Sequence, residues 1–129
     1  MRVSMGTASY PPHLRLRHKP DFQRVLRRGL IYPGGQCLVR VLENGQGHPR
    51  LGIAAPRRYG KAIRRNRFRR LVREAFRALQ HDLGGLDVMV SPRKGLEIPT
   101  LPGLLADIGR APRAARPQRA MRERTGKKK

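Results

Sequence analysis

The clearest pattern of apolar positions runs from Lys61 to His81, where they recur every three or four residues. The apolar side chains are Phe68, Leu71, Val72, Ala75, Phe76 and Leu79. They fall at i, i+3, i+4, i+7, i+8 and i+11, which places them on one face of an α-helix. Gly84-Gly85 follows and would end the element. The pattern predicts a long amphipathic helix with one face buried and the other in solvent.

Two shorter helices are predicted on either side of this one. The first begins near Pro20 and ends before Gly29, residue types typical of a first turn and of a C-terminal cap. Its apolar stripe is made of Phe22, Val25 and Leu26. The second begins at Thr100, whose hydroxyl can cap a helix. Its apolar stripe is made of Leu101, Leu104, Leu105 and Ile108.

Three strands are predicted from shorter apolar runs. Residues 36–42 alternate, with Cys37, Val39 and Val41 on one face, and a second run covers 50–55. The connection between them is too short for a crossover, so we expect an antiparallel pair. The third run, 86–90, is apolar enough to predict a buried strand. Tyr32-Pro33-Gly34-Gly35 is expected to be a turn.

With 129 residues, the chain is long enough for one domain. We expect that domain to span 14–109. Residues 1–13 show no periodicity and are expected to form a flexible arm. Residues 110–129 are strongly basic and interrupted by prolines, so we expect a disordered tail.

The charge balance narrows the class of protein. Thirty Lys and Arg residues face eight Asp and Glu, which gives a formal net charge of +22. Such a field attracts nucleic acid or an anionic surface, and an ordinary metabolic enzyme is not expected. No apolar run approaches the roughly 18 residues of a membrane span, and the N-terminus lacks the apolar region of a secretory signal. The cytoplasm is therefore the expected compartment, with no membrane partner.

Most of the helical charge lies opposite the apolar face. Between Arg57 and Arg77 there are ten Lys or Arg and one acid, Glu74. Asn66, Arg69, Arg70, Arg73 and Arg77 share one arc of the helix, and Arg65 and Arg67 flank it. A merely solvated face usually mixes both signs, whereas this one is almost free of acids. The pattern favours phosphate binding, for which arginine is well suited.

Residues for catalysis are not apparent. The four histidines are dispersed, and no two carboxylates are spaced to face each other on a helix. The single cysteine, Cys37, lies in a predicted strand and is expected to be a buried structural thiol. We therefore predict no catalytic residue and no protein metal site.

Residues 60–77 closely resemble the signature helix of the bacterial ribonuclease P protein component. The triplet Arg65-Asn66-Arg67, the pair Arg70-Leu71 and the ending from Arg73 to Phe76 match in register. Residues 21–29 resemble the first helix of that family, and 50–53 its strand before the signature loop.

This resemblance implies an α+β fold, a compact α/β sandwich with a mixed sheet of about four strands, about three helices and a left-handed βαβ crossover. It also implies a function, that of the protein subunit of ribonuclease P. That subunit assists the Mg²⁺-dependent removal of the 5′ leader from precursor tRNA. The catalytic centre and the Mg²⁺ are expected in the RNA subunit. The implied partners are ribonuclease P RNA and precursor tRNA, with one protein per RNA and a monomer when free.

The resemblance and the basic pattern together give two sets of site residues. The set expected to bind the RNA subunit is Arg57, Arg58, Lys61, Arg64, Arg65, Asn66, Arg67, Arg69, Arg70, Arg73 and Arg77. The set expected to line a cleft for the leader is Arg17, Lys19, Phe22, Leu26 and Arg40. Phe22 is expected to point toward strand 36–42, either as a core residue or as a ring on which bases stack. A ribosomal or ribosome-associated RNA-binding protein remains the alternative.

Overall fold

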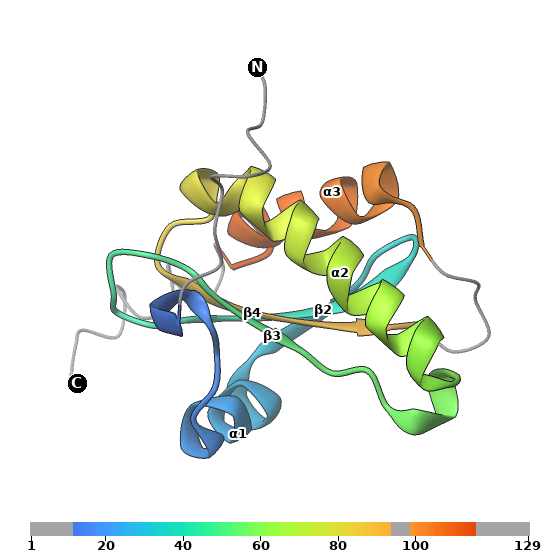
Figure 1. The fold of residues 1–129 in the computed structure, drawn as a ribbon. Helices are drawn as coiled ribbons and strands as arrows, with labels where there is room; N and C mark the ends of the chain where they lie inside the picture. The colour runs from blue at the N-terminus through green and yellow to red at the C-terminus, as the bar shows by residue number, and fades with distance from the viewer. Residues whose placement is uncertain (1–11, 94–98, 116–129) are drawn as a thin grey trace.

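The computed structural model describes residues 12–93 and 99–115, which form a four-stranded sheet with helices on both faces (Figure 1). The elements in chain order are η1 (Pro12–Leu14), α1 (Lys19–Arg28), β1 (Leu30–Pro33), β2 (Cys37–Glu43), β3 (Arg50–Ile53), η2 (Arg57–Tyr59), α2 (Ala62–Leu79), η3 (Gln80–Asp82), β4 (Leu86–Pro92) and α3 (Leu101–Gly109). The three predicted helices and the α+β class are confirmed. The Thr100 hydroxyl caps α3 as expected, accepting from the Gly103 N–H at 3.2 Å.

The strand order is β1-β2-β4-β3, with β2 antiparallel to both of its neighbours and β3 parallel to β4. The expected pairing of 36–42 with 50–55 is therefore wrong, because β4 lies between these strands. Every residue of β4 from Leu86 to Val90 is buried, and a strand covered on both faces takes a central place. The connection from β2 to β3 crosses the start of β4, where the Asn44 N–H donates to the Gly85 carbonyl at 3.0 Å.

The strand β1 was not expected from the sequence, which predicted a turn at 32–35. Tyr32 and Pro33 instead pair with β2, and the chain turns at residues 34–36. Pro33 is compatible with this position because β1 is an edge strand. The buried Asp107 carboxylate of α3 holds the turn by accepting from the N–H groups of Gly35 at 2.9 Å and Gln36 at 2.8 Å.

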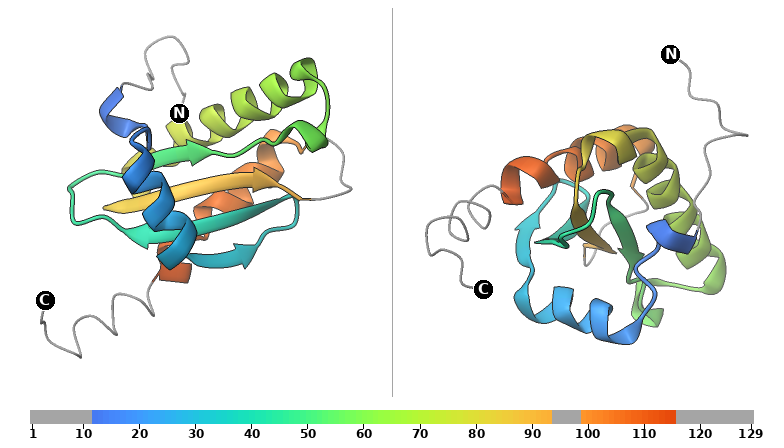
Figure 2. Two further views of the ribbon diagram at one scale, coloured as in Figure 1. Left: turned by 90° about the horizontal axis from the view of Figure 1, so that it is seen from below. Right: turned by 90° about the vertical axis from the view of Figure 1, so that its left-hand side faces the viewer.

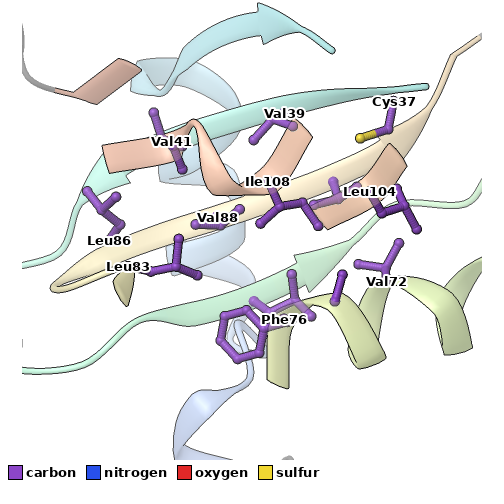
Figure 3. Close-up of a cluster of buried hydrophobic side chains, with 14 of the residues drawn as sticks. Cys37, Val39, Val41, Val72, Phe76, Leu83, Leu86, Val88, Leu104 and Ile108 are labelled. Atoms are coloured by element: carbon purple, nitrogen blue, oxygen red, sulfur yellow. The ribbon is translucent and has the colours of Figure 1, made fainter. Parts of the chain in front are cut away.

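The main core lies between the sheet and the helices α2 and α3. Figure 3 shows the buried side chains of the sheet, of α2 and of α3 meeting in this core. The residues labelled there include Val72 and Phe76 of α2, Leu104 and Ile108 of α3, and Cys37, Val39, Val41 and Val88 of the sheet. The predicted inward faces of α2 and β2 are thus confirmed.

The helix α1 covers the other face of the sheet and crosses its strands (Figure 2). Beneath it lies a smaller cluster of the buried residues Leu16, Val25 and Met89, with Phe22 and Leu42 packed at its side. Because α1 occupies only part of this face, the two faces of the sheet are unequally covered.

The chain after α3 departs from the predicted tail. Residues 111–115 are helical, and Ala111 and Ala115 are fully buried in the main core. Pro112 is tolerated because it lies in the first turn of this helical segment. The expectation of disorder is therefore wrong for 110–115, because small alanine side chains pack despite the flanking charge. Residues 1–11 and 116–129, which make up most of the predicted arm and tail, lie outside the described residues.

Candidate nucleic-acid interface

The helix α2 separates its apolar and basic residues as its sequence predicts. Phe68, Val72, Ala75 and Phe76 are buried. On the outer side Lys61, Asn66, Arg67 and Arg70 are exposed, and Arg64, Arg65, Arg69, Arg73 and Arg77 are partly exposed. Arg57 and Arg58 are exposed in η2, directly before the helix. The structure thus gathers the whole predicted RNA-binding set on η2 and α2.

Local hydrogen bonds orient two arginines at the start of this surface. The Arg65 Nε donates to the Gly60 carbonyl at 3.1 Å, and the Arg69 Nη1 donates to the Asn66 Oδ1 at 3.2 Å. Gly60 itself has φ +155°, and a Cβ there would collide with the Arg64 side chain. The turn into α2 therefore requires glycine. Asn66 holds a neighbouring guanidinium, one of the roles its amide allows.

An aromatic residue outside both predicted sets fixes η2 against α2. The Tyr59 ring lies edge-on to Phe68, with the centroids 5.4 Å apart. The Arg64 guanidinium lies 4.5 Å from the Tyr59 centroid, within cation–π range. The sequence signal that could have identified Tyr59 is its place as an aromatic residue directly after two arginines. These contacts keep the arginines of η2 and of the first turns of α2 on one continuous surface.

The predicted leader-cleft residues lie on the α1 side, away from α2. Arg17 and Lys19 are exposed, Leu26 is 44% exposed, and Phe22 is half-buried. A side chain added at Gly52 would meet the Phe22 ring at 3.1 Å, so this ring packs over β3. The prediction that Phe22 points toward strand 36–42 is therefore wrong. Because α1 crosses the strands, its first turn lies nearer β3 than β2.

Arg40 is a basic residue that β2 places on this side of the sheet. It alternates in β2 with Val39 and Val41, which face the main core, and it pairs with Met89 of β4. The Arg40 Nε is buried and has no hydrogen-bond partner among the described residues. A buried donor without an acceptor is energetically costly.

An ion-pair network anchors α1 to the sheet. The Arg50 guanidinium donates to both Asp87 carboxylate oxygens at 2.8 Å, and its Nη1 reaches the Asp21 Oδ2 at 3.1 Å. The Asn44 amide also donates to Asp87, at 2.9 Å. Local periodicity carried no indication of this network, since Arg50 is 29 residues from Asp21 and 37 from Asp87. The network fixes the start of α1, and with it Phe22.

The single cysteine lies in the core. Cys37 is buried as predicted, and its burial, with the adjacent Asp107 carboxylate, raises the pKa of the thiol well above its ordinary value. Within 12–93 and 99–115, no three His, Cys, Asp or Glu residues are grouped so that they could hold a metal ion. No helix in these same ranges is long and apolar enough to cross a bilayer.

Comparisons with known proteins agree on one family. A sequence model described as ribonuclease P matches residues 10–115. The ribonuclease P protein component of Chlamydia trachomatis is 38% identical over 90 residues, which cover 69% of this chain and 75% of that protein. The counterpart from Dictyoglomus thermophilum is 36% identical over 97 residues, which cover 72% of this chain and 80% of the relative.

Solved structures give the same result for the fold. The ribonuclease P protein of Thermotoga maritima superposes with a TM-score of 0.67 at 33% identity, covering 77% of this chain and 96% of its own. The Staphylococcus aureus protein superposes with a TM-score of 0.67 at 26% identity, covering 79% and 94%. The ribosomal alternative is not favoured by any of these matches. Sequence and fold together show that the chain belongs to the ribonuclease P protein family.

Proposed function

We propose that the surface formed by η2 and the outer side of α2 binds the RNA subunit of ribonuclease P, with one protein per RNA. As a ribonuclease P protein component, the chain takes part in an endoribonuclease complex and associates with its RNA. The observation that carries the proposal is the segregation on α2, where the basic residues are outside and Phe68 and Phe76 are fully buried. The planar guanidinium of an arginine can donate two parallel hydrogen bonds to the oxygens of one phosphate.

The hydrolysis itself is assigned to the RNA subunit in this proposal. Among the described residues no acidic or histidine cluster is placed to hold a metal ion, so the Mg²⁺ of the reaction is proposed to be held by RNA. The role of this chain is then to neutralise phosphates and to hold substrate. Reducing phosphate repulsion lowers the amount of Mg²⁺ that the RNA needs for folding and substrate binding.

The 5′ leader of precursor tRNA is proposed to bind on the α1 side. Phe22 and Leu26 supply apolar surface, and Arg17, Lys19 and Arg40 supply positive charge. The buried Nε of Arg40 is a donor on this face without an acceptor among the described residues. The leader would then contact a different side of the protein from the RNA subunit, so both can bind at once.

Reconstitution tests this function. The full chain is combined with a bacterial ribonuclease P RNA, and cleavage of precursor tRNA is compared with and without protein at low Mg²⁺. We expect the protein to increase cleavage at the mature 5′ end and to show no cleavage when the RNA is omitted. Cleavage by the protein alone, unaffected by removing contaminating RNA, would show that the catalytic centre is in this chain. An unchanged rate with RNA would exclude the proposed subunit role.

A further inference from the structure

One large apolar side chain lies among the basic and polar residues on the outer side of α2. Ile63 lies in the first turn of the helix and is 83% exposed. The other two exposed large apolar residues in the described chain, Leu26 and Ile31, are 44% and 51% exposed. Ile63 falls outside the apolar stripe that predicts the helix, so the periodicity gives it no role in the core.

The neighbours of Ile63 belong to the proposed RNA-binding surface. Asn66, Arg67 and Arg70 follow it at i+3, i+4 and i+7 and are all exposed. At 100° per residue, these four side chains share an arc of about 100° on the outer side of the helix. The first turns of α2 extend beyond the ends of the strands (Figure 1). The exposure of these four side chains shows that the arc faces outward. Ile63 is thus an apolar side chain within a positively charged surface.

The stability of the protein alone does not account for isoleucine at this position. The side chain is not part of either core cluster, and a β-branched residue is a weaker helix former than alanine. The first turn also contains no acidic residue, the type that the helix dipole favours there. A single exposed apolar residue is common on protein surfaces, so its location among the arginines is what points to a partner.

RNA offers a surface that fits this arrangement. Single-stranded segments of folded RNA present unstacked bases, whose faces are apolar while the adjoining phosphates are charged. An isoleucine flanked by arginines matches both features at once. We infer that Ile63 packs against an unstacked base of the ribonuclease P RNA while Arg67 and Arg70 contact the adjoining phosphates. This inference rests on the proposed function and names the kind of RNA contact made at that surface.

The test separates an apolar contact from a charged one by salt dependence. The affinity of the full chain for ribonuclease P RNA is measured over a range of KCl concentrations for the variants Ile63→Ala and Ile63→Lys. Ile31→Ala is the matched control, because Ile31 is also an exposed isoleucine but lies in β1. Alanine is the better helix former, so Ile63→Ala should keep its melting temperature, which is measured on the same samples.

We expect Ile63→Ala to weaken binding roughly five- to fiftyfold, the effect of removing three carbons from a partly buried apolar contact. The slope of log affinity against log salt should stay unchanged, because the protein still neutralises the same phosphates. Ile63→Lys should also bind more weakly than wild type, despite its added charge. Ile31→Ala should assemble normally.

Two results would overturn the inference. Unchanged affinity of Ile63→Ala would show that Ile63 does not touch the RNA. Tighter binding and a steeper salt slope for Ile63→Lys would show that the surface is purely electrostatic at this point. Failure of the proposed function gives a different result, in which wild type itself does not bind the RNA at any salt concentration.

Discussion

The buried pair of Arg50 and Asp87 gives the sharpest prediction about stability. Asp87 is fully buried and accepts two charged hydrogen bonds from Arg50 at 2.8 Å and one from Asn44 at 2.9 Å. Asp87→Asn keeps the shape of the side chain but removes its negative charge. Among the described residues, the Arg50 guanidinium then has a single carboxylate partner, the partly exposed Asp21. Breaking a buried ion pair by removing one partner costs roughly 3–5 kcal/mol.

That cost is large compared with the free energy of unfolding of a typical domain, roughly 5–15 kcal/mol. For a domain of this size it should lower the melting temperature by more than about 10 °C. Urea unfolding followed by circular dichroism measures the free energy directly. Hydrogen bonding to Asp87 raises the pKa of Arg50 above its ordinary value, so the stabilisation from the charged guanidinium is fully present in neutral and mildly alkaline buffer. The destabilisation should therefore be the same in neutral and mildly alkaline buffer.

Asp21→Asn is the matched control for this variant. It removes a carboxylate from the same guanidinium at 3.1 Å, but the Asp21 side chain is 24% exposed. Partly solvated pairs are worth only about 0–1 kcal/mol, so this variant should lie close to wild type. A destabilisation below about 1 kcal/mol for Asp87→Asn, or equal values for both variants, would refute the argument that burial sets the cost.

The remaining predictions concern binding, packing and reactivity. Arg65→Ala/Arg70→Ala should weaken assembly with the RNA and lower the salt slope by roughly 0.7–0.9 for each phosphate that the variant no longer neutralises; an unchanged slope and affinity would mean that this face is only solvated. Phe76→Ala should destabilise the fold by roughly 3–5 kcal/mol in urea unfolding, and a mutant that melts normally but no longer binds RNA would show that the faces of α2 are misassigned. Phe22→Ala should weaken binding of precursor tRNA that carries a leader, while mature tRNA binding and assembly stay nearly unchanged; equal effects on both tRNAs, or an effect explained by lower thermal stability, would make Phe22 a core residue. The Cys37 thiol, whose pKa is raised by burial, should resist thiol reagents in the native protein and react after unfolding, and fast labelling of the native state would contradict its burial.

The sequence by itself determined the features that depend on near neighbours along the chain. Helix α2 was predictable because contacts at i+3 and i+4 impose a period on its apolar residues, from Phe68 to Leu79. The alternation in β2 and the Thr100 cap are equally local. The charge of +22 and the pattern around Arg65-Asn66-Arg67 also indicated the class of partner. None of these inferences depends on which elements contact each other in the folded protein.

Tertiary structure decided everything that depends on distant partners. The position of β4 between β2 and β3 follows from burying both of its faces, which the length of a connection does not reveal. The Asp107 carboxylate accepts from the N–H groups of Gly35 and Gln36, which lie 72 and 71 residues away along the chain. Arg50 donates to Asp87 of the neighbouring strand, 37 residues away. Phe22 lies over β3 because α1 crosses the sheet, an angle fixed by packing and not by the helix period. Side-chain periodicity determines which face of an element is buried, and only the packed fold determines what that face meets.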